Sequence, residues 1–181
     1  RDVASVNTKR TAKAIIYDIT NKDNPSVLRE IELDGTYSNS RMIGDNIYFI
    51  STKYAYYTKN MLDEEILPVW KDTAISEELN HVDCKGIAYF ENTESNSFTL
   101  VAGFNINDNE SMFLETFFGA SNTVYASENN LYLVQIRYEN GWMETNNTIY
   151  KFNLKNAEVI LECQADVKGD LNNQFSLDEF E

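Results

Sequence analysis

The sequence predicts an all-β protein made of repeated units, each with four short antiparallel strands. The main observation is an internal repeat, because residues 35–54 return without a gap as residues 119–138. Strand-like apolar runs also alternate with clusters of turn-forming residues along most of the chain. The composition, 43% hydrophobic and 13% aromatic in 181 residues, is typical of one folded domain with a core and not of a disordered chain.

Each copy of the repeat has the pattern of a β-hairpin. It begins at a glycine and continues as an extended stretch, a two-residue polar corner and an apolar run rich in β-branched and aromatic residues. The predicted corners are Asp45-Asn46 in the first copy and Asn129-Asn130 in the second. Identical residues at matched positions are Gly35 and Gly119, Asn46 and Asn130, Tyr48 and Tyr132, and Tyr54 and Tyr138.

Two further strand-like runs precede each glycine of the repeat. Before Gly35 they cover 14–19 and 26–33, and equivalent pairs precede Gly119 and a third glycine, Gly169. The third copy begins at Gly169 and ends before its second strand. The repeat units therefore cover about 11–54, 86–138 and 148–181, with a loop insertion at 55–85.

Four antiparallel strands repeated in this way are typical of the blades of a β-propeller, where repetition leaves only short, protected sheet edges. A β-sandwich with coincidentally similar hairpins is the competing interpretation, which the ungapped match disfavours. We therefore predict one partial propeller over 1–181, with about two to three blades. In the first unit, the continuous Ile15-Ile16 pair indicates an inner strand, and the alternation in 31–34 indicates a half-exposed outer strand.

Longer motifs carry a family resemblance. They read YDIT at 17–20, LREIELDG at 28–35, SRMIGD at 40–45, VYASENNLY at 124–132 and NQFSLDEF at 173–180. In these motifs the chain resembles the secreted bacterial and archaeal β-propeller family described as distantly related to WD-type repeats. The resemblance runs from about residue 12 to the end. It implies an extracellular or cell-surface location and no defined reaction, and, because members are much longer, that this chain is a middle portion of a propeller.

The charge balance excludes several classes of partner. Lys and Arg total 15 against 29 Asp and Glu, so the net charge is -14. Nucleic acids and anionic membranes both require a basic surface, and we predict neither as a partner. No run approaches the roughly 18 apolar residues of a membrane-spanning helix in this segment. Cys84 and Cys163 fall in different repeats, which favours two separate buried thiols over a disulfide.

Catalytic and metal-binding patterns fail when they are tested one by one. His81 is the single histidine and has no neighbouring nucleophile motif. The cluster 81–84 offers one His, one Asp and one Cys, which is short of a structural zinc set. Residues 170–181 resemble a calcium loop, but Phe175 stands where the sharp turn needs glycine, and the repeat places it in a strand. We therefore predict no catalytic residues, no metal and no cofactor.

The insertion at 55–85 is the predicted place for a binding site. Its aromatic residues Tyr56, Tyr57 and Trp70 have the character of recognition anchors. In the alternative interpretation they pin the loop over a neighbouring blade.

The predicted function is that of a non-enzymatic, secreted or cell-surface module that binds or scaffolds a protein or a glycan. Two alternatives stay open. One is a propeller enzyme acting on envelope polysaccharide or peptide, which carboxylates from several repeats in one pocket would favour. The other is a purely structural segment of a larger propeller, whose open strand edges should self-associate. An exposed aromatic patch on the insertion would favour the binding module.

Overall fold

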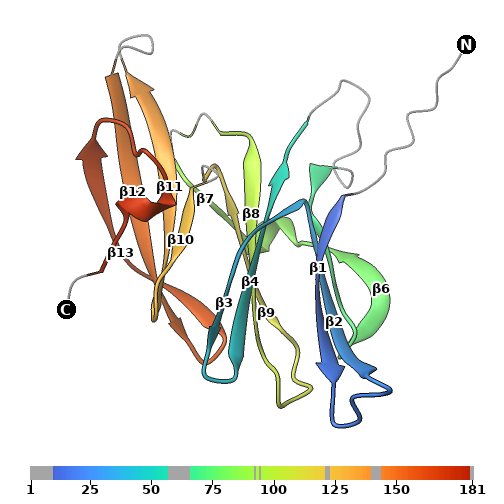
Figure 1. Ribbon diagram of the computed structural model, residues 1–181. Helices are drawn as coiled ribbons and strands as arrows, with labels where there is room; N and C mark the ends of the chain where they lie inside the picture. The colour runs from blue at the N-terminus through green and yellow to red at the C-terminus, as the bar shows by residue number, and fades with distance from the viewer. Residues whose placement is uncertain are drawn as a thin grey trace, which may run out of the picture.

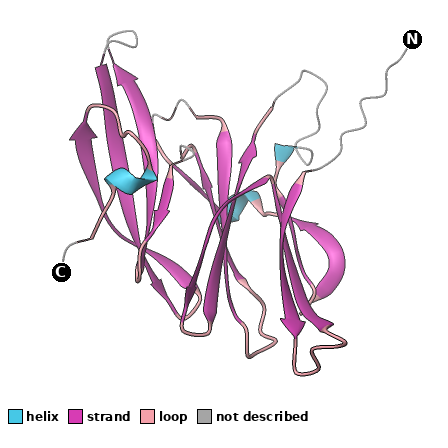
Figure 2. Cartoon of the chain, viewed as in Figure 1, coloured by secondary structure: helices cyan, strands magenta, loops and turns pink. Residues whose placement is uncertain are grey.

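The computed structural model describes residues 10–56, 66–91, 93, 95–120, 123–139 and 144–179. These residues form three twisted sheets that stand side by side (Figure 1). Strands dominate, and the helical turns are short (Figure 2). Within the described ranges no helix is long and apolar enough to cross a membrane. The all-β class that the sequence predicts is confirmed, and sheets with four antiparallel strands are present, although one sheet has a fifth strand that pairs in parallel.

The sheets are called A, B and C in chain order. Sheet A has the order β1 (Thr11–Asp18), β2 (Ser26–Asp34), β5 (Val69–Asp72) and β6 (Ser76–His81). Sheet B has the order β3 (Thr36–Ile43), β4 (Asn46–Tyr54), β8 (Ser97–Asn105), β9 (Phe113–Phe118) and β7 (Ile87–Tyr89). Sheet C has the order β10 (Val124–Ala126), β11 (Asn130–Glu139), β12 (Glu144–Lys155) and β13 (Glu158–Lys168). Two 3-10 turns, η1 (Cys84–Gly86) and η2 (Gln174–Ser176), complete the described elements.

Sheets and sequence repeats are out of phase, which the repeat pattern did not indicate. At Gly35 the chain leaves β2 of sheet A and enters β3 of sheet B, and at Gly119 it passes from β9 of sheet B to β10 of sheet C. The φ angles of Gly35 and Gly119 are +96° and +100°, and that of Gly169, which follows β13, is +93°. A Cβ on Gly35 would lie 2.2 Å from the carbonyl oxygen of Thr52. The three glycines therefore share a left-handed backbone conformation, and at each of them the chain leaves a sheet.

Two local details of the prediction are corrected. The first hairpin corner lies one residue earlier than expected, at Gly44 and Asp45, because Gly44 takes a φ of +58° and Ile43 pairs with Asn46. The inner and outer strands of the first unit are exchanged. β2 lies between β1 and β5, and Ile31 is fully buried while Ile15 is 41% exposed.

The insertion at 55–85 is not wholly a loop. Its described part contains β5 and β6, which extend sheet A beyond β2, with Trp70 of β5 paired opposite Leu33. η1 and β7 follow, and β7 pairs in parallel with β9 at the edge of sheet B. The insertion thus contributes strands to one sheet and leads directly into the edge strand of the next.

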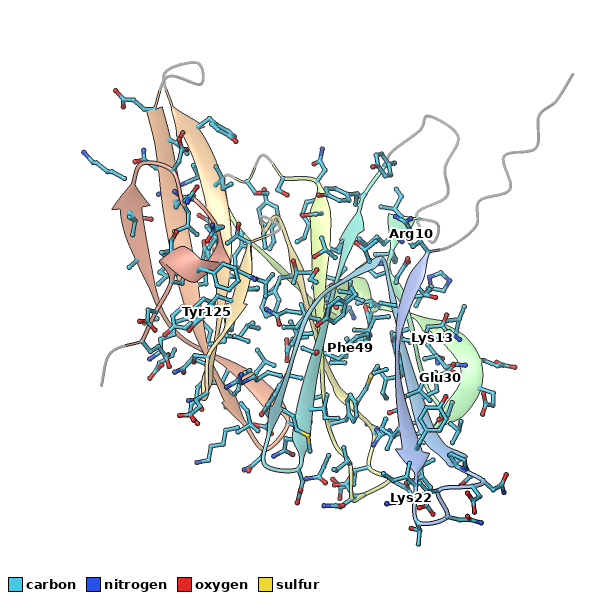
Figure 3. The ribbon with its side chains drawn as sticks, in the orientation of Figure 1. Arg10, Lys13, Lys22, Glu30, Phe49 and Tyr125 are labelled. Carbon is cyan, nitrogen blue, oxygen red and sulfur yellow. The ribbon has the colours of Figure 1, made fainter. Side chains whose placement is uncertain are left out.

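Sheet B is buried on both faces, because an apolar cluster fills each of the two interfaces. The cluster between sheets A and B includes Phe49, Leu100 and Phe104, and Phe49 lies in the interior in Figure 3. The cluster between sheets B and C includes Val101 and Phe117. β8 supplies side chains to both clusters in alternation, which explains why its sequence is a continuous apolar run.

The outer face of sheet A is charged. Lys13 of β1 lies beside Glu30 of β2 (Figure 3), at an Nζ–Oε1 distance of 2.9 Å, and Lys71 of β5 reaches the same oxygen at 2.7 Å. The hydrogen bonds from Lys71 and Lys13 lower the pKa of Glu30. This face therefore interacts with solvent, and the apolar face of sheet A points toward sheet B.

A buried ion pair joins the insertion to sheet A. The Arg29 side chain of β2 donates to both carboxylate oxygens of Asp72 in β5, at 2.9 and 2.7 Å, and to the carbonyl of Glu110 at 2.8 Å. Asp72 also accepts from the N–H of Met112 at 3.0 Å. Burial alone would raise the pKa of Asp72, but these hydrogen bonds outweigh it, so the pKa is lowered.

The β12–β13 turn of sheet C packs against sheet B where β8 has a glycine. Asn156 and Ala157 form this turn with φ angles of +52° and +66°. A Cβ on Gly103 would lie only 1.8 Å from the carbonyl oxygen of Ala157. The absence of a side chain at Gly103 therefore allows the two sheets to approach at this point.

Candidate functional site

The candidate site is built around β7, the edge strand of sheet B. The Asp83 side chain accepts the N–H of Lys85 and so begins η1, and the N–H of Ile87 donates to the carbonyl of Cys84 where η1 ends. The chain then runs parallel to β9, with Ala88 opposite Phe117. Side chains of β7 alternate between the faces of sheet B. Ile87 packs on the cluster between sheets A and B, whereas Phe90, just beyond β7, belongs to the cluster between sheets B and C.

On the sheet A side of β7 lies an open groove of about 800 Å³, here called the apolar groove. Phe98 and Phe118 form its floor, with ring centroids 4.8 Å apart. Tyr89 stacks on Phe118 at 6.1 Å and is 59% exposed. Tyr56, 73% exposed, lines the same groove, and Asn96 supplies a polar amide. The groove therefore presents exposed aromatic rings over a carbon-rich floor.

On the sheet C side of β7 lies a second groove of about 480 Å³, here called the acidic groove. Its floor is aromatic, with the rings of Phe90 and Tyr150 stacked at 4.1 Å. Glu91 and Glu115 line it, and none of its lining residues is basic. Burial raises the pKa of Glu115. Among the residues that the structure describes, neither carboxylate forms an ion pair, so both can receive a cationic group.

The aromatic residues predicted as anchors fall in different places. Tyr56 lines the apolar groove. Tyr57 lies outside the described residues. Trp70 is partly buried in the strand β5 and packs against the cluster between sheets A and B.

Sequence reasoning missed Tyr89, Phe118 and the two groove carboxylates. The available signals were the short aromatic runs at 87–90 and 117–118, which read as ordinary strand sequence. Their role depends on β7 pairing with β9, and a strand of three residues gives too little pattern to predict its partner.

The residues considered for metal or thiol chemistry do not come together in the described part of the chain. In the described part of the chain no group of three or more His, Cys, Asp and Glu side chains is placed to hold a metal. Cys84 and Cys163 are both free, but both are exposed, so the predicted burial of the thiols is wrong. Cys84 lines the apolar groove.

Phe175, expected in a strand, lies in η2 and is 81% exposed, because Asn173 accepts its N–H and starts a 3-10 turn.

Comparison with known families settles the classification. A family model described as the beta propeller domain matches residues 1–181. This chain belongs to the beta propeller domain family. No curated protein and no solved structure matches the chain. In this propeller domain, sheets B and C are successive blades, β7 extends a blade beyond its fourth strand, β9, and the acidic groove lies between the two blades.

Proposed function

We propose that this beta propeller domain is a non-enzymatic, secreted or cell-surface module that binds a segment of a partner protein in the apolar groove. One observation carries the proposal: Tyr56 and Tyr89 are exposed over the aromatic floor of a groove of about 800 Å³. Exposed aromatic patches on a soluble domain are typical of recognition surfaces, because burying such rings on binding is favourable.

The polarity of the groove favours a protein segment over a glycan. Asn96 and the tyrosine hydroxyls are the main polar groups among side chains that are otherwise apolar. A sugar ring stacks on aromatic rings but also requires several hydrogen bonds for its hydroxyl groups, which become costly when they are buried without partners. Apolar side chains of a peptide have no such requirement. The proposed location rests on the resemblance to an exported family and not on the groove.

Screening the chain for binding to two classes of ligand tests the proposal. The whole chain would be used to select binders from a phage-displayed random peptide library and, separately, to probe an array of bacterial envelope glycans. Selected peptides should bind Tyr89→Ala and Tyr56→Ala at least about tenfold more weakly than the unmodified chain. Tyr17→Ala is the matched control, because Tyr17 is 50% exposed on β1, outside both grooves.

The outcomes separate the alternatives. Peptides that depend on Tyr89 and not on Tyr17 support the proposal, provided that thermal melts of the variants match. Binding of glycans alone would overturn the choice of a protein partner. Equal losses in all three variants would show that the groove is not the binding site.

A further inference from the structure

β7 has one paired and one open edge. β7 stands last in the order of sheet B, and no strand of the described chain pairs with its other edge. The N–H of Phe90 donates to the carbonyl of Phe118, so the main-chain groups of Phe90 point toward β9. In a strand these directions alternate from residue to residue, and the main-chain groups of Tyr89 therefore point to the open edge.

A strand added at this edge would place side chains in both grooves. Successive side chains of a strand point to opposite faces of the sheet, about 3.3 Å apart along the chain. One face of β7 borders the apolar groove and the other borders the acidic groove, and Tyr89 lines both. A bound extended peptide would therefore direct every second side chain into each groove.

The acidic groove has the chemistry of a site for a cationic side chain. Glu91 and Glu115 lack basic partners among the described residues, and Leu161, 55% exposed, offers apolar surface beside them. A lysine or arginine can lay its methylene stem along such apolar and aromatic surface while its charged head reaches a carboxylate. The net charge of -14 also attracts basic segments during encounter.

We propose that the open edge of β7 binds an extended peptide by strand addition, with apolar side chains in the apolar groove and alternating lysine or arginine side chains in the acidic groove. This inference rests on the proposed function, since it uses the same apolar groove. It adds the conformation of the partner, the main-chain recognition and the basic residues. The partner is thus a segment in which apolar and basic residues alternate.

The test uses a synthetic peptide, acetyl-Val-Lys-Leu-Lys-Val-amide, titrated into the whole chain by calorimetry. Glu115→Gln and Glu91→Gln should each weaken its binding about tenfold, a change of about 1.4 kcal/mol. Replacing both lysines of the peptide with norleucine should abolish the difference between these variants and the unmodified chain. Glu128→Gln is the matched control variant, because Glu128 is exposed and lies outside both grooves.

Backbone methylation tests the strand addition. Main-chain N–H groups of an added strand point alternately to β7 and away from it. Methylating the amides of the valines and leucine, or those of the lysines, should therefore abolish binding in one case and leave it within about threefold in the other. Equal effects of the two methylation patterns would overturn strand addition.

Failure of this inference is distinguishable from failure of the proposed function. If the peptides selected from the library depend on Tyr89 while Glu115→Gln and both methylation patterns have no effect, the apolar groove binds a partner in another way. If Tyr89→Ala changes nothing for any peptide, both proposals fall. Weakening by Glu128→Gln equal to that by Glu115→Gln would mean general charge attraction and would overturn the acidic groove as a site.

Discussion

Replacing Asp72 with alanine tests the buried ion pair that joins the insertion to sheet A. The Arg29 and Asp72 side chains are 4% and 0% exposed, so Asp72→Ala leaves a guanidinium buried without its carboxylate. Breaking such a pair costs about 3–5 kcal/mol in the free energy of unfolding. For a domain of this size, about 2–4 °C of melting temperature is lost per kcal/mol, so the variant should melt roughly 6–20 °C lower.

The assay is urea unfolding of the single and double variants. Arg29→Met combined with Asp72→Leu should recover most of the loss, because it removes both charges and keeps apolar volume. In the unmodified chain, the lowered pKa of Asp72 means that its contribution is complete above its ordinary pKa of 3.8 and is lost as the pH falls below that value. Asp72→Asn should remove this part of the acid sensitivity. A loss below about 1 kcal/mol for Asp72→Ala would refute the assignment of a buried, strongly coupled pair.

Three further predictions concern the interfaces and the grooves. Gly103→Ala should lower the free energy of unfolding by about 3 kcal/mol or more in urea titrations, because its Cβ would clash with the carbonyl of Ala157. Gly86→Ala is the control and should lower the free energy of unfolding far less, because Gly86 has open space around it. A bound groove peptide should slow the alkylation of Cys84 at least about threefold, as mass spectrometry can follow, and leave exposed Cys163 unprotected. Glu115→Gln should leave the free energy of unfolding at neutral pH unchanged or raise it by up to about 0.5 kcal/mol. The reason is that the raised pKa of Glu115 means that the folded state disfavours its charge. A decrease of more than about 0.5 kcal/mol would instead reveal a stabilising partner of Glu115.

The local units of the fold could be predicted because they depend on residues close together in the chain. Gly35, Gly119 and Gly169 were matched by the repeat alone, and all three adopt φ angles between +93° and +100°. The hairpins that follow the first two were also predicted, although the first corner moved by one residue because Gly44 accepts a positive φ. Turn chemistry is local, and it is therefore readable from a short stretch of sequence.

The blade boundaries and the grooves could not be predicted in the same way. β4 pairs with β3 inside the first repeat, as predicted, but its other neighbour is β8, which lies in the second repeat unit. A side-chain period of two is the same for every candidate partner, so the pattern does not identify which strand lies alongside. Ile15 and Ile31 show the consequence. The sequence indicates that the strand of Ile15 is the buried one, but β2 lies between β1 and β5, so Ile31 is fully buried and Ile15 is 41% exposed.

The sequence by itself determined the all-β class, the repeat, the membership in the propeller family and the strong negative charge, and it singled out Tyr56 as a candidate binding residue. Tertiary structure alone decided that β7 is an edge strand, that Tyr89 separates two grooves, and that Glu91 and Glu115 face an aromatic floor without a basic partner in the described chain. The physical reason is that strand formation follows local patterns, whereas a groove exists only where sheets from distant parts of the chain pack together.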